Sequence, residues 1–477
     1  MLTISKSFFE YLNNQGVRYC HWKSNEHLEQ ALSGKTDLDI LVHIDDKLDF
    51  ENALKIFSFK KIISPPEKQF PGMSDYLGFD SDTGNFIHLH VHYQLILGQR
   101  FIKNHHLPIE DLIFKNLILK DDVKIPCPEL ELILLIIRAN MKVDVLSLLK
   151  HAIKDVTSNN GYTAYPAAIG GEIRSLIQRS NIEKLKNLLY ESKLPIRENL
   201  FLQFIQTYSD KNMNFYHIVA VQNEVLKSLK EYRRNTGLRV LISYASFYIK
   251  EIPYLRKLFR HTKKTLNGEG KIISIVGADG SGKSSLICDL DKWLSWKLCV
   301  NRYYYGIPKN LIGKSVSFFT RGFNKVKLTS LEKLINYFFW IYVARTRYLI
   351  SLSSKRAIKE GKIVITDRYP MREFYKMPEP MDGPRLQNEV SFTGRYFSKI
   401  ESGYYEKILD SNYLIVLQVN LEDLRKRKSD LSYSNHEIKA QAVNSIKERG
   451  NVKIIDANKP YSEVLLNIKK IIWNQII

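Results

Sequence analysis

Residues 271–290 constrain the fold of this chain more than any other segment. Residues 272–276 are apolar and mostly β-branched, which predicts a buried strand. The next eight residues, GADGSGKS at 277–284, fit the pattern G-x-x-x-x-G-K-[ST], and a helical pattern begins at Lys283. A strand, a glycine-rich loop and a helix in this order form a site for the phosphates of a nucleotide. The alternative interpretation is a glycine turn that holds no ligand.

The residue types in this loop suit the binding of phosphate and Mg²⁺. The glycines allow backbone angles that other residues resist, so that successive N–H groups can converge on phosphate oxygens. Lys283 can reach the β- and γ-phosphates, and the hydroxyl group of Ser284 can bind Mg²⁺. We therefore expect ATP and Mg²⁺ to bind here. The expected contacts come from Gly277, Asp279, Gly280, Ser281, Gly282, Lys283, Ser284 and Ser285.

The composition narrows the class of protein. At 477 residues the chain is too long for one core, which favours about two to four domains. Of its 71 basic and 50 acidic residues, 17 and 20 lie in residues 1–150, so the remainder carries a net charge of +24. This excess can attract ATP, an anionic membrane surface or nucleic acid. Four cysteines without a C-x-x-C pair, and no apolar run long enough to span a bilayer, favour a cytoplasmic protein.

Two aspartates on one strand indicate a second site near the N-terminus. In residues 37–42, DLDILV, alternation places Asp37 and Asp39 on one face and apolar residues on the other. Two carboxylates on one face, soon after a glycine turn, are typical of a divalent metal site that bridges to nucleotide phosphates. The alternative is a polar edge strand that exposes its acids to solvent.

Over residues 1–145 the sequence resembles the nucleotidyltransferase superfamily, whose sites combine a glycine turn, an Asp-x-Asp strand and a third carboxylate on a neighbouring strand. The resemblance implies an α/β domain in which Asp37 and Asp39 bind metal. The sequence departs from the family in two ways. The glycine turn lies closer to the aspartates than is usual, and the strand at residues 86–93 has histidines where the third acid is expected.

These histidines allow two interpretations. Because side chains alternate along a strand, His88, His90 and His92 share one face. Imidazole is a common metal ligand, so the face can form a metal site. Three residues spread along one strand rarely converge on one ion, however, and a solvated or hydrogen-bonded face is the other interpretation.

Residues 146–268 show helical periodicity without a chemical motif, and we expect them to form a helical connector. From residue 227 to residue 264 these helices are basic. They form either a solvated connector or a face that binds an anionic membrane surface or nucleic acid.

Beyond the glycine-rich loop, apolar strands alternate with helical patterns. The strands are predicted at residues 361–366, 413–419 and 452–456. This alternation predicts a parallel sheet with helices on both faces. The first of the three strands leads to Asp367, at the position where P-loop proteins place an acid beside the Mg²⁺ of the nucleotide.

From residue 270 to the end, the sequence resembles the thymidylate kinase group of nucleoside monophosphate kinases. The resemblance rests on the loop GADGSGKSS, on Arg345 in the helix that leads to Asp367-Arg368, on arginines at a mobile lid and on the last strand. The segment RYYYGIP at residues 302–308 stands where the family has Arg-Glu-Pro-Gly. The resemblance therefore implies phosphoryl transfer, but to an acceptor other than thymidine monophosphate.

The resemblance also implies a role for each candidate residue. The implied catalytic residues are Lys283, Asp367, Arg368, Arg425 and Arg427. The implied acceptor-binding residues are Arg345, Arg368 and Tyr305. The expected metal ligands are Ser284 and Asp367 here, with Asp37 and Asp39 in the N-terminal domain. Arg425 and Arg427 would close over the transferring phosphate; the alternative is that they lie on a solvated helix face.

We therefore expect an α/β multidomain protein with a nucleotidyltransferase-like domain at 1–145, a helical connector at 146–268 and a thymidylate kinase-like P-loop domain at 269–477. The expected activity is ATP-dependent transfer of the γ-phosphoryl group to a small anionic acceptor. One alternative is nucleotidyl transfer at Asp37 and Asp39 with an accessory ATP-binding domain. The other is a non-enzymatic switch driven by ATP binding.

Overall fold

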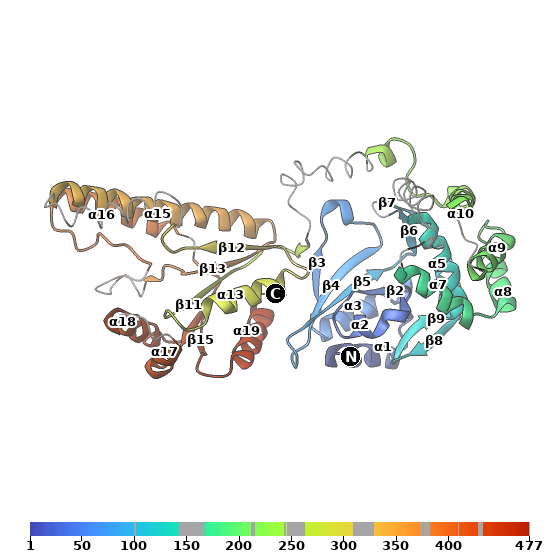
Figure 1. The fold of residues 1–477 in the computed structure, drawn as a ribbon, viewed down its shortest axis with the longest axis horizontal. Helices are drawn as coiled ribbons and strands as arrows, with labels where there is room; N and C mark the ends of the chain where they lie inside the picture. The colour runs from blue at the N-terminus through green and yellow to red at the C-terminus, as the bar shows by residue number, and fades with distance from the viewer. Residues whose placement is uncertain are drawn as a thin grey trace. The chain divides into compact units, whose positions relative to one another are not determined.

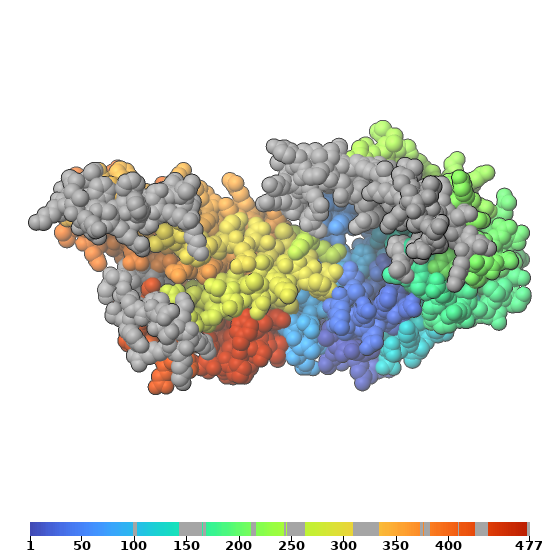
Figure 2. Space-filling view, viewed as in Figure 1, coloured from blue at the N-terminus to red at the C-terminus, as the bar shows by residue number. Residues whose placement is uncertain are grey.

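The computed structural model describes residues 1–99, 102–142, 165, 167–210, 215–242, 245, 263–308, 329–372, 375, 382–408, 410–427 and 433–476. The chain divides into two compact units, Met1–Thr262 and Lys263–Ile477. The described residues of the first unit run from blue to green in Figure 2, and those of the second from yellow to red. Each unit has its own sheet and its own apolar core.

The first unit contains a mixed sheet with the strand order β1-β2-β5-β4-β3 (Figure 1). Its strands are β1 (Tyr19–His21), β2 (Leu38–Val42), β3 (Lys60–Ile63), β4 (Met73–Phe79) and β5 (Phe86–His92). β2 and β5 are parallel neighbours, whereas the β1–β2, β3–β4 and β4–β5 pairs are antiparallel. The α/β character that the sequence predicts is present, and the nucleotidyltransferase-like fold of this unit stays a prediction.

Helices and two hairpins surround this sheet. The helices are α1 (Thr3–Asn14), α2 (Leu28–Leu32), α3 (Lys47–Ile56) and α4 (Glu110–Lys115), with short 3₁₀ turns at Asn25–His27, Ile44–Asp46 and Pro66–Lys68. The hairpins are β6 (Ile96–Gln99) with β7 (Ile102–His106), and β8 (Leu117–Lys120) with β9 (Val123–Pro126). Phe8 of α1 packs edge-on against Phe50 of α3, and both rings are fully buried beside the sheet. Burial of such rings is the main favourable term in holding these helices on the strands.

The helical segment that the sequence marks as a connector packs inside the first unit. It contains α7 (Ala167–Arg179), α8 (Ile182–Ser192), α9 (Glu198–Ser209), α10 (Phe215–Ser228) and a 3₁₀ turn at Leu229–Tyr232. These helices share one apolar core with α5 (Pro128–Lys142), whose residues are buried almost all round, and with Trp22 next to β1. The three-part division at residues 145 and 268 stays a prediction. Of the basic run, residues 243, 244 and 246–262 lie outside the described residues.

The second unit contains a 5-stranded sheet with the order β12-β13-β11-β14-β15, and all its strand pairs are parallel. The strands are β11 (Ile272–Gly277), β12 (Val300–Tyr304), β13 (Ile363–Asp367), β14 (Tyr413–Gln418) and β15 (Val452–Asp456), preceded by the short β10 (Thr265–Leu266). The parallel sheet that the sequence predicts for this part is therefore present. Its central strand, β11, leads directly into the glycine-rich loop.

Helices cover both faces of this sheet. They are α13 (Lys283–Leu294), α15 (Thr329–Lys359), α16 (Phe392–Glu406), α17 (Leu421–Arg427), α18 (Tyr433–Asn444) and α19 (Tyr461–Ile476). Ile272 of β11 packs with Ala357 of α15, and Val276 of the same strand packs with Val443 of α18. Because residues 272 and 276 share one face, α15 and α18 cover that face, and α13 packs against the strands from the other. Figure 1 shows α16 running alongside α15.

No described helix is both long enough and apolar enough to cross a membrane.

Candidate active site

The glycine-rich loop joins β11 to α13 with the backbone geometry that its glycines allow. Gly280 and Gly282 have φ angles of +95° and +89°, in the left-handed region that favours glycine. Gly282 is the N-cap of α13, and a β-carbon on Gly277 would lie 2.6 Å from the hydroxyl oxygen of Ser281. The loop therefore places backbone N–H groups and the positive end of α13 at one point, which is an arrangement that binds phosphate.

Lys283, the first residue of α13, folds back over this loop. Its Nζ donates hydrogen bonds to the carbonyl oxygens of Gly277 and Ala278 at 2.7 and 2.6 Å. The side chain is buried, and this burial lowers the pKa of Lys283 to about 8. The two serines that follow, Ser284 and Ser285, are exposed on the first turn of α13.

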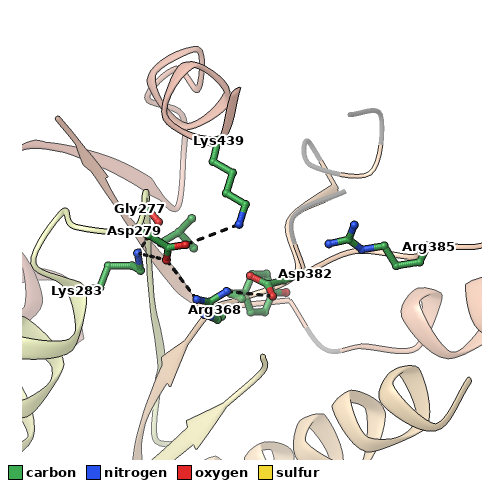
Figure 3. Close-up of a pocket in the computed structure, with 9 residues that line it drawn as sticks. Gly277, Asp279, Lys283, Arg368, Asp382, Arg385 and Lys439 are labelled. Atoms are coloured by element: carbon green, nitrogen blue, oxygen red, sulfur yellow. Dashed lines mark hydrogen bonds and ion pairs between the residues drawn. The ribbon is translucent and has the colours of Figure 1, made fainter. Parts of the chain in front are cut away.

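Four cations and two carboxylates line a pocket above the loop (Figure 3). Asp279 lies 3.7 Å from the Nζ of Lys283, 3.2 Å from a guanidinium nitrogen of Arg368 and 3.7 Å from the Nζ of Lys439. Arg385 also lines the pocket, and its guanidinium group stacks on Trp340 at 5.3 Å from the ring centroid. The excess of positive charge makes this pocket suited to an anionic ligand.

Two residues of the pocket have a backbone conformation that side chains disfavour. Arg368 has a φ angle of +60° and Asp382 one of +53°, and their side chains lie 3.9 Å apart. Such conformations cost about 1–3 kcal/mol each and are found most often at functional sites. Burial also raises the pKa of Asp382, although Arg347 and Arg368 oppose that rise. The backbone strain and the shifted pKa of Asp382 make this part of the unit a candidate functional site.

Asp367, at the end of β13, has a carboxylate that fits a metal ion. Its Oδ1 is buried and has no hydrogen-bond partner among the described residues. A buried carboxylate oxygen without a partner is costly, and Mg²⁺ prefers oxygen ligands of this kind. Ser284 presents its hydroxyl group on α13, as a second oxygen donor. These residues therefore fit the expected Mg²⁺.

A second hollow of about 390 Å³ includes Asp367 in its lining. It is lined by Ile287, Arg302, Tyr303, Tyr304 and Asp367. Tyr305, the predicted acceptor-binding residue, is only 2 % exposed, and burial raises its pKa to about 12. Tyr303 and Tyr304, rather than Tyr305, line this hollow. The acceptor role of Tyr305 stays a prediction.

The helix α15 carries one buried arginine, Arg347, and two exposed ones, Arg345 and Arg356. Arg345, the predicted acceptor-binding residue, is exposed, whereas Arg347 is 2 % exposed. Arg347 donates to the carbonyl oxygens of Tyr305 and Asp382 at 2.6 Å each and also bonds the hydroxyl group of Tyr405. It therefore ties the end of β12 to the strained segment at Asp382. The acceptor role of Arg345 stays a prediction.

Sequence reasoning missed Arg347, although a signal was present. Arg347 is spaced by helical intervals from Val343, Ser351 and Ser354, and all four are buried. This spacing places them on the inner face of α15. The predicted lid residues Arg425 and Arg427 belong to α17, but their side chains lie outside the described residues. Sequence reasoning also assigned no role to Asp382, Arg385 or Lys439.

In the first unit, the sheet gathers the aspartates and histidines that the sequence singles out. Asp39 on β2 pairs with His90 on β5, and His90 pairs on its other side with Asp75 on β4. Asp37 lies 2.9 Å from Nδ1 of His88, and Nε2 of His88 lies 3.1 Å from Asp75. Sequence reasoning missed Asp75. This acid lies on β4, two strands away from β2, and pairs with His90 on β5, the strand on which the third carboxylate is expected.

Basic side chains adjoin the same cluster. The Nζ of Lys23 lies 2.5 Å from Oδ1 of Asp39, and the Nζ of Lys103 lies 3.4 Å from Nε2 of His90. Burial lowers the pKa of Lys103 to about 7 and lowers the pKa of both His90 and His92. Although burial favours the neutral acid, Lys23 and the neighbouring histidines hold the pKa of Asp39 well below its usual range. The metal role of Asp37 and Asp39 stays a prediction.

The fold and the loop geometry define the second unit as a P-loop α/β domain. No family model matches the chain. The "Uncharacterized ATP-binding protein YghR" of Escherichia coli strain K12 is 28% identical over 221 residues, which cover 42% of this chain and 85% of that protein. The protein of the same name from Escherichia coli O6:H1 strain CFT073 gives the same values.

Among solved structures, a thymidylate kinase from Candida albicans matches with 19% sequence identity and a TM-score of 0.30. The match covers 43% of this chain and 92% of that chain. Each of these similarities covers less than half of the chain, and together they assign no fold to the N-terminal unit.

Proposed function

We propose that this protein is an ATP-dependent phosphotransferase that moves the γ-phosphoryl group of ATP to a small anionic acceptor. The observation that carries the proposal is the pocket in which Lys283, Arg368, Arg385 and Lys439 meet above a phosphate-binding loop. Phosphoryl transfer requires mainly positioning and neutralisation of charge, and this pocket offers both. The relative YghR is named as an ATP-binding protein, which supports ATP as the donor.

The donor is held by the loop and by the first turn of α13. The N–H groups of the loop and the ammonium group of Lys283 bind the β- and γ-phosphates, for which Lys283 exchanges its two carbonyl partners. Ser284 and Asp367 hold Mg²⁺, which when bound neutralises charge on the phosphates. Asp367 also orients the acceptor, because it lines the hollow next to the loop.

The acceptor is anionic and approaches from the side of Asp367 and Arg368. Asp367 and Arg368 are consecutive residues at the end of β13. Arg368 lines the cationic pocket, and Asp367 lines the second hollow together with Tyr304. The guanidinium group of Arg368 lies 6.0 Å from the ring centroid of Tyr304, so one acceptor can contact both. The guanidinium groups of Arg368 and Arg385 both line the cationic pocket. Two such groups favour a phosphate or carboxylate on the acceptor.

A radiochemical assay tests the proposal. The purified full chain is incubated with Mg²⁺, ATP labelled on the γ-phosphate, and a panel of nucleotides, sugars and sugar phosphates. We expect label to move to an anionic acceptor with the native chain and not with Lys283→Ala. Lys292→Ala, an exposed lysine on the same helix, is the matched control and should remain active. Transfer by a folded Lys283→Ala protein at the native rate would contradict the proposal.

One observation favours nucleotidyl transfer in the first unit as a second candidate function. Asp75 supplies a carboxylate near the strand that carries Asp37 and Asp39, although an intervening histidine strand separates them. The same assay distinguishes the candidates, because nucleotidyl transfer releases pyrophosphate and γ-phosphoryl transfer releases ADP. Nucleotide binding with neither product would support a non-enzymatic switch.

A further inference from the structure

We propose that the first unit binds one divalent transition-metal ion through the carboxylate of Asp39 and the imidazole rings of His90 and His92. This site is separate from the proposed phosphotransferase site and does not depend on it. Its ligands come from β2 and β5, which are parallel neighbours in the mixed sheet.

The geometry brings the three ligand atoms together. Asp39 pairs directly with His90, and His92 follows on the same face of β5. One ligand atom from each of the three residues lies within 4.8 Å of the others. The rings of His90 and His92 have their centroids 4.7 Å apart, whereas those of His88 and His90 are 6.4 Å apart. Two neighbouring histidines and the facing aspartate therefore converge, which histidines alone along one strand would not do.

The surroundings of His90 orient it as a ligand. Its Nδ1 lies 2.7 Å from Oδ1 of Asp75, so Nδ1 carries the proton and Nε2 has a free lone pair. A carboxylate that holds the far nitrogen of a histidine is the usual second partner of a metal-binding imidazole. The Nζ of Lys103 lies 3.4 Å from Nε2, so Lys103 would have to move aside for an ion to bind there.

His92 is the strongest indication of a ligand. It is fully buried, and neither ring nitrogen has a hydrogen-bond partner among the described residues. Its Nε2 lies 3.5 Å from Oδ1 of Asp39. Buried polar atoms normally have a partner, and a metal ion shared with Asp39 would supply one for Nε2.

The neighbouring residues do not belong to the ligand set. His88 lies between Asp37 and Asp75, at 2.9 and 3.1 Å, and its Nε2 is hydrogen-bonded to Asp75. Asp37 contacts His88, at the end of the cluster opposite to His92. The ligand set is therefore one carboxylate and two imidazoles, with Asp75 as the supporting carboxylate.

This set selects the class of metal. Imidazole nitrogens favour Zn²⁺, Fe²⁺, Co²⁺, Ni²⁺ or Cu²⁺, whereas Mg²⁺, Ca²⁺ and Mn²⁺ prefer oxygen ligands. Three protein ligands also leave coordination positions for water or a substrate. The ammonium group of Lys23, 2.5 Å from Asp39, competes with the ion for the same carboxylate. Metal binding therefore requires Lys23 to swing away, which its flexible side chain allows.

Metal titration of the full chain tests this inference. The protein is stripped with a chelator and titrated with Co²⁺ and Zn²⁺ without nucleotide, and binding is followed by calorimetry and by the visible absorption of Co²⁺. We expect one ion per chain, and more than about 100-fold weaker binding in His90→Gln and in His92→Gln. Asp75→Asn should weaken binding about 10- to 100-fold. Lys23→Met should tighten it about tenfold, because a competing charge is removed.

Three control variants exclude other binding positions. His27→Gln removes an exposed histidine of the same unit, Cys288→Ser removes the exposed thiol, and Ser284→Ala removes a ligand of the phosphate loop. All three should bind the ion as the native chain does. Unchanged affinity in both His90→Gln and His92→Gln would overturn the inference, as would native binding weaker than about 100 µM.

A second measurement covers variants that fail to fold. Circular dichroism and thermal melting identify them, because His92 lies in the core. Pulsed electron paramagnetic resonance of Cu²⁺ bound to the native chain then counts the imidazole ligands directly. We expect couplings from two histidine nitrogens at one site, and a spectrum without imidazole coupling would overturn the inference.

Discussion

Raising the pH from 7 to 9 should weaken the binding of nucleotide, through the titration of Lys283. Burial lowers the pKa of this lysine to about 8, and the bound phosphates require its charged form. With that pKa, about nine-tenths of the lysine is charged at pH 7 and about one-tenth at pH 9. If only the charged form binds, the apparent Kd rises about tenfold over this range, which corresponds to about 1.4 kcal/mol.

The assay is calorimetric or fluorescent titration of the full chain with a non-hydrolysable ATP analogue and Mg²⁺ at several pH values. The control is Lys283→Met, which keeps the length of the side chain and removes the charge. Lys283→Met should bind more weakly at pH 7, and its affinity should change little with pH. This variant also corrects for ionisation of the nucleotide, because both proteins bind the same ligand.

Two results would refute the reasoning. One is an affinity of the native chain that does not change between pH 7 and 9. The other is a parallel loss in the native chain and in Lys283→Met, which would assign the titration to another group. A steeper loss in the native chain alone would instead indicate that a second group titrates together with Lys283.

Three further outcomes are expected. Arg347→Met should lower the free energy of unfolding by about 3–5 kcal/mol, measured by urea denaturation, because it removes a buried guanidinium group and leaves the half-buried carboxylate of Asp382 with less compensation. A loss below about 1 kcal/mol would contradict the role of Arg347 in tying β12 to this segment. Asp37→Asn combined with Asp39→Asn should leave γ-phosphoryl transfer nearly unchanged, and a large loss in the labelled-ATP assay would show that both units serve one reaction. Thymidine monophosphate should be a poor acceptor in steady-state kinetics, and a kcat/KM of about 10⁴ M⁻¹s⁻¹ or more would refute the altered acceptor pocket.

Features that depend only on neighbouring residues could be predicted from the sequence. The strand before the glycine-rich loop and the helix that begins at Lys283 follow from periodicity and from the spacing of the loop. The strands that end at Asp367 and at Asp456 could be predicted for the same reason, because a buried parallel strand is a continuous apolar run. Local pattern was enough for these elements, because each one is defined within about ten residues of chain.

The tertiary structure alone decided which side chains meet. Arg347 rather than Arg345 lies inside the second unit, because the rotation of α15 is set by packing against the sheet. Asp75 joins the cluster around His90 only through the pairing of β4 with β5. These contacts join residues far apart in the sequence. A residue's neighbours across a sheet or a helix interface depend on register and rotation, and both are fixed by burial of the whole core rather than by any short segment.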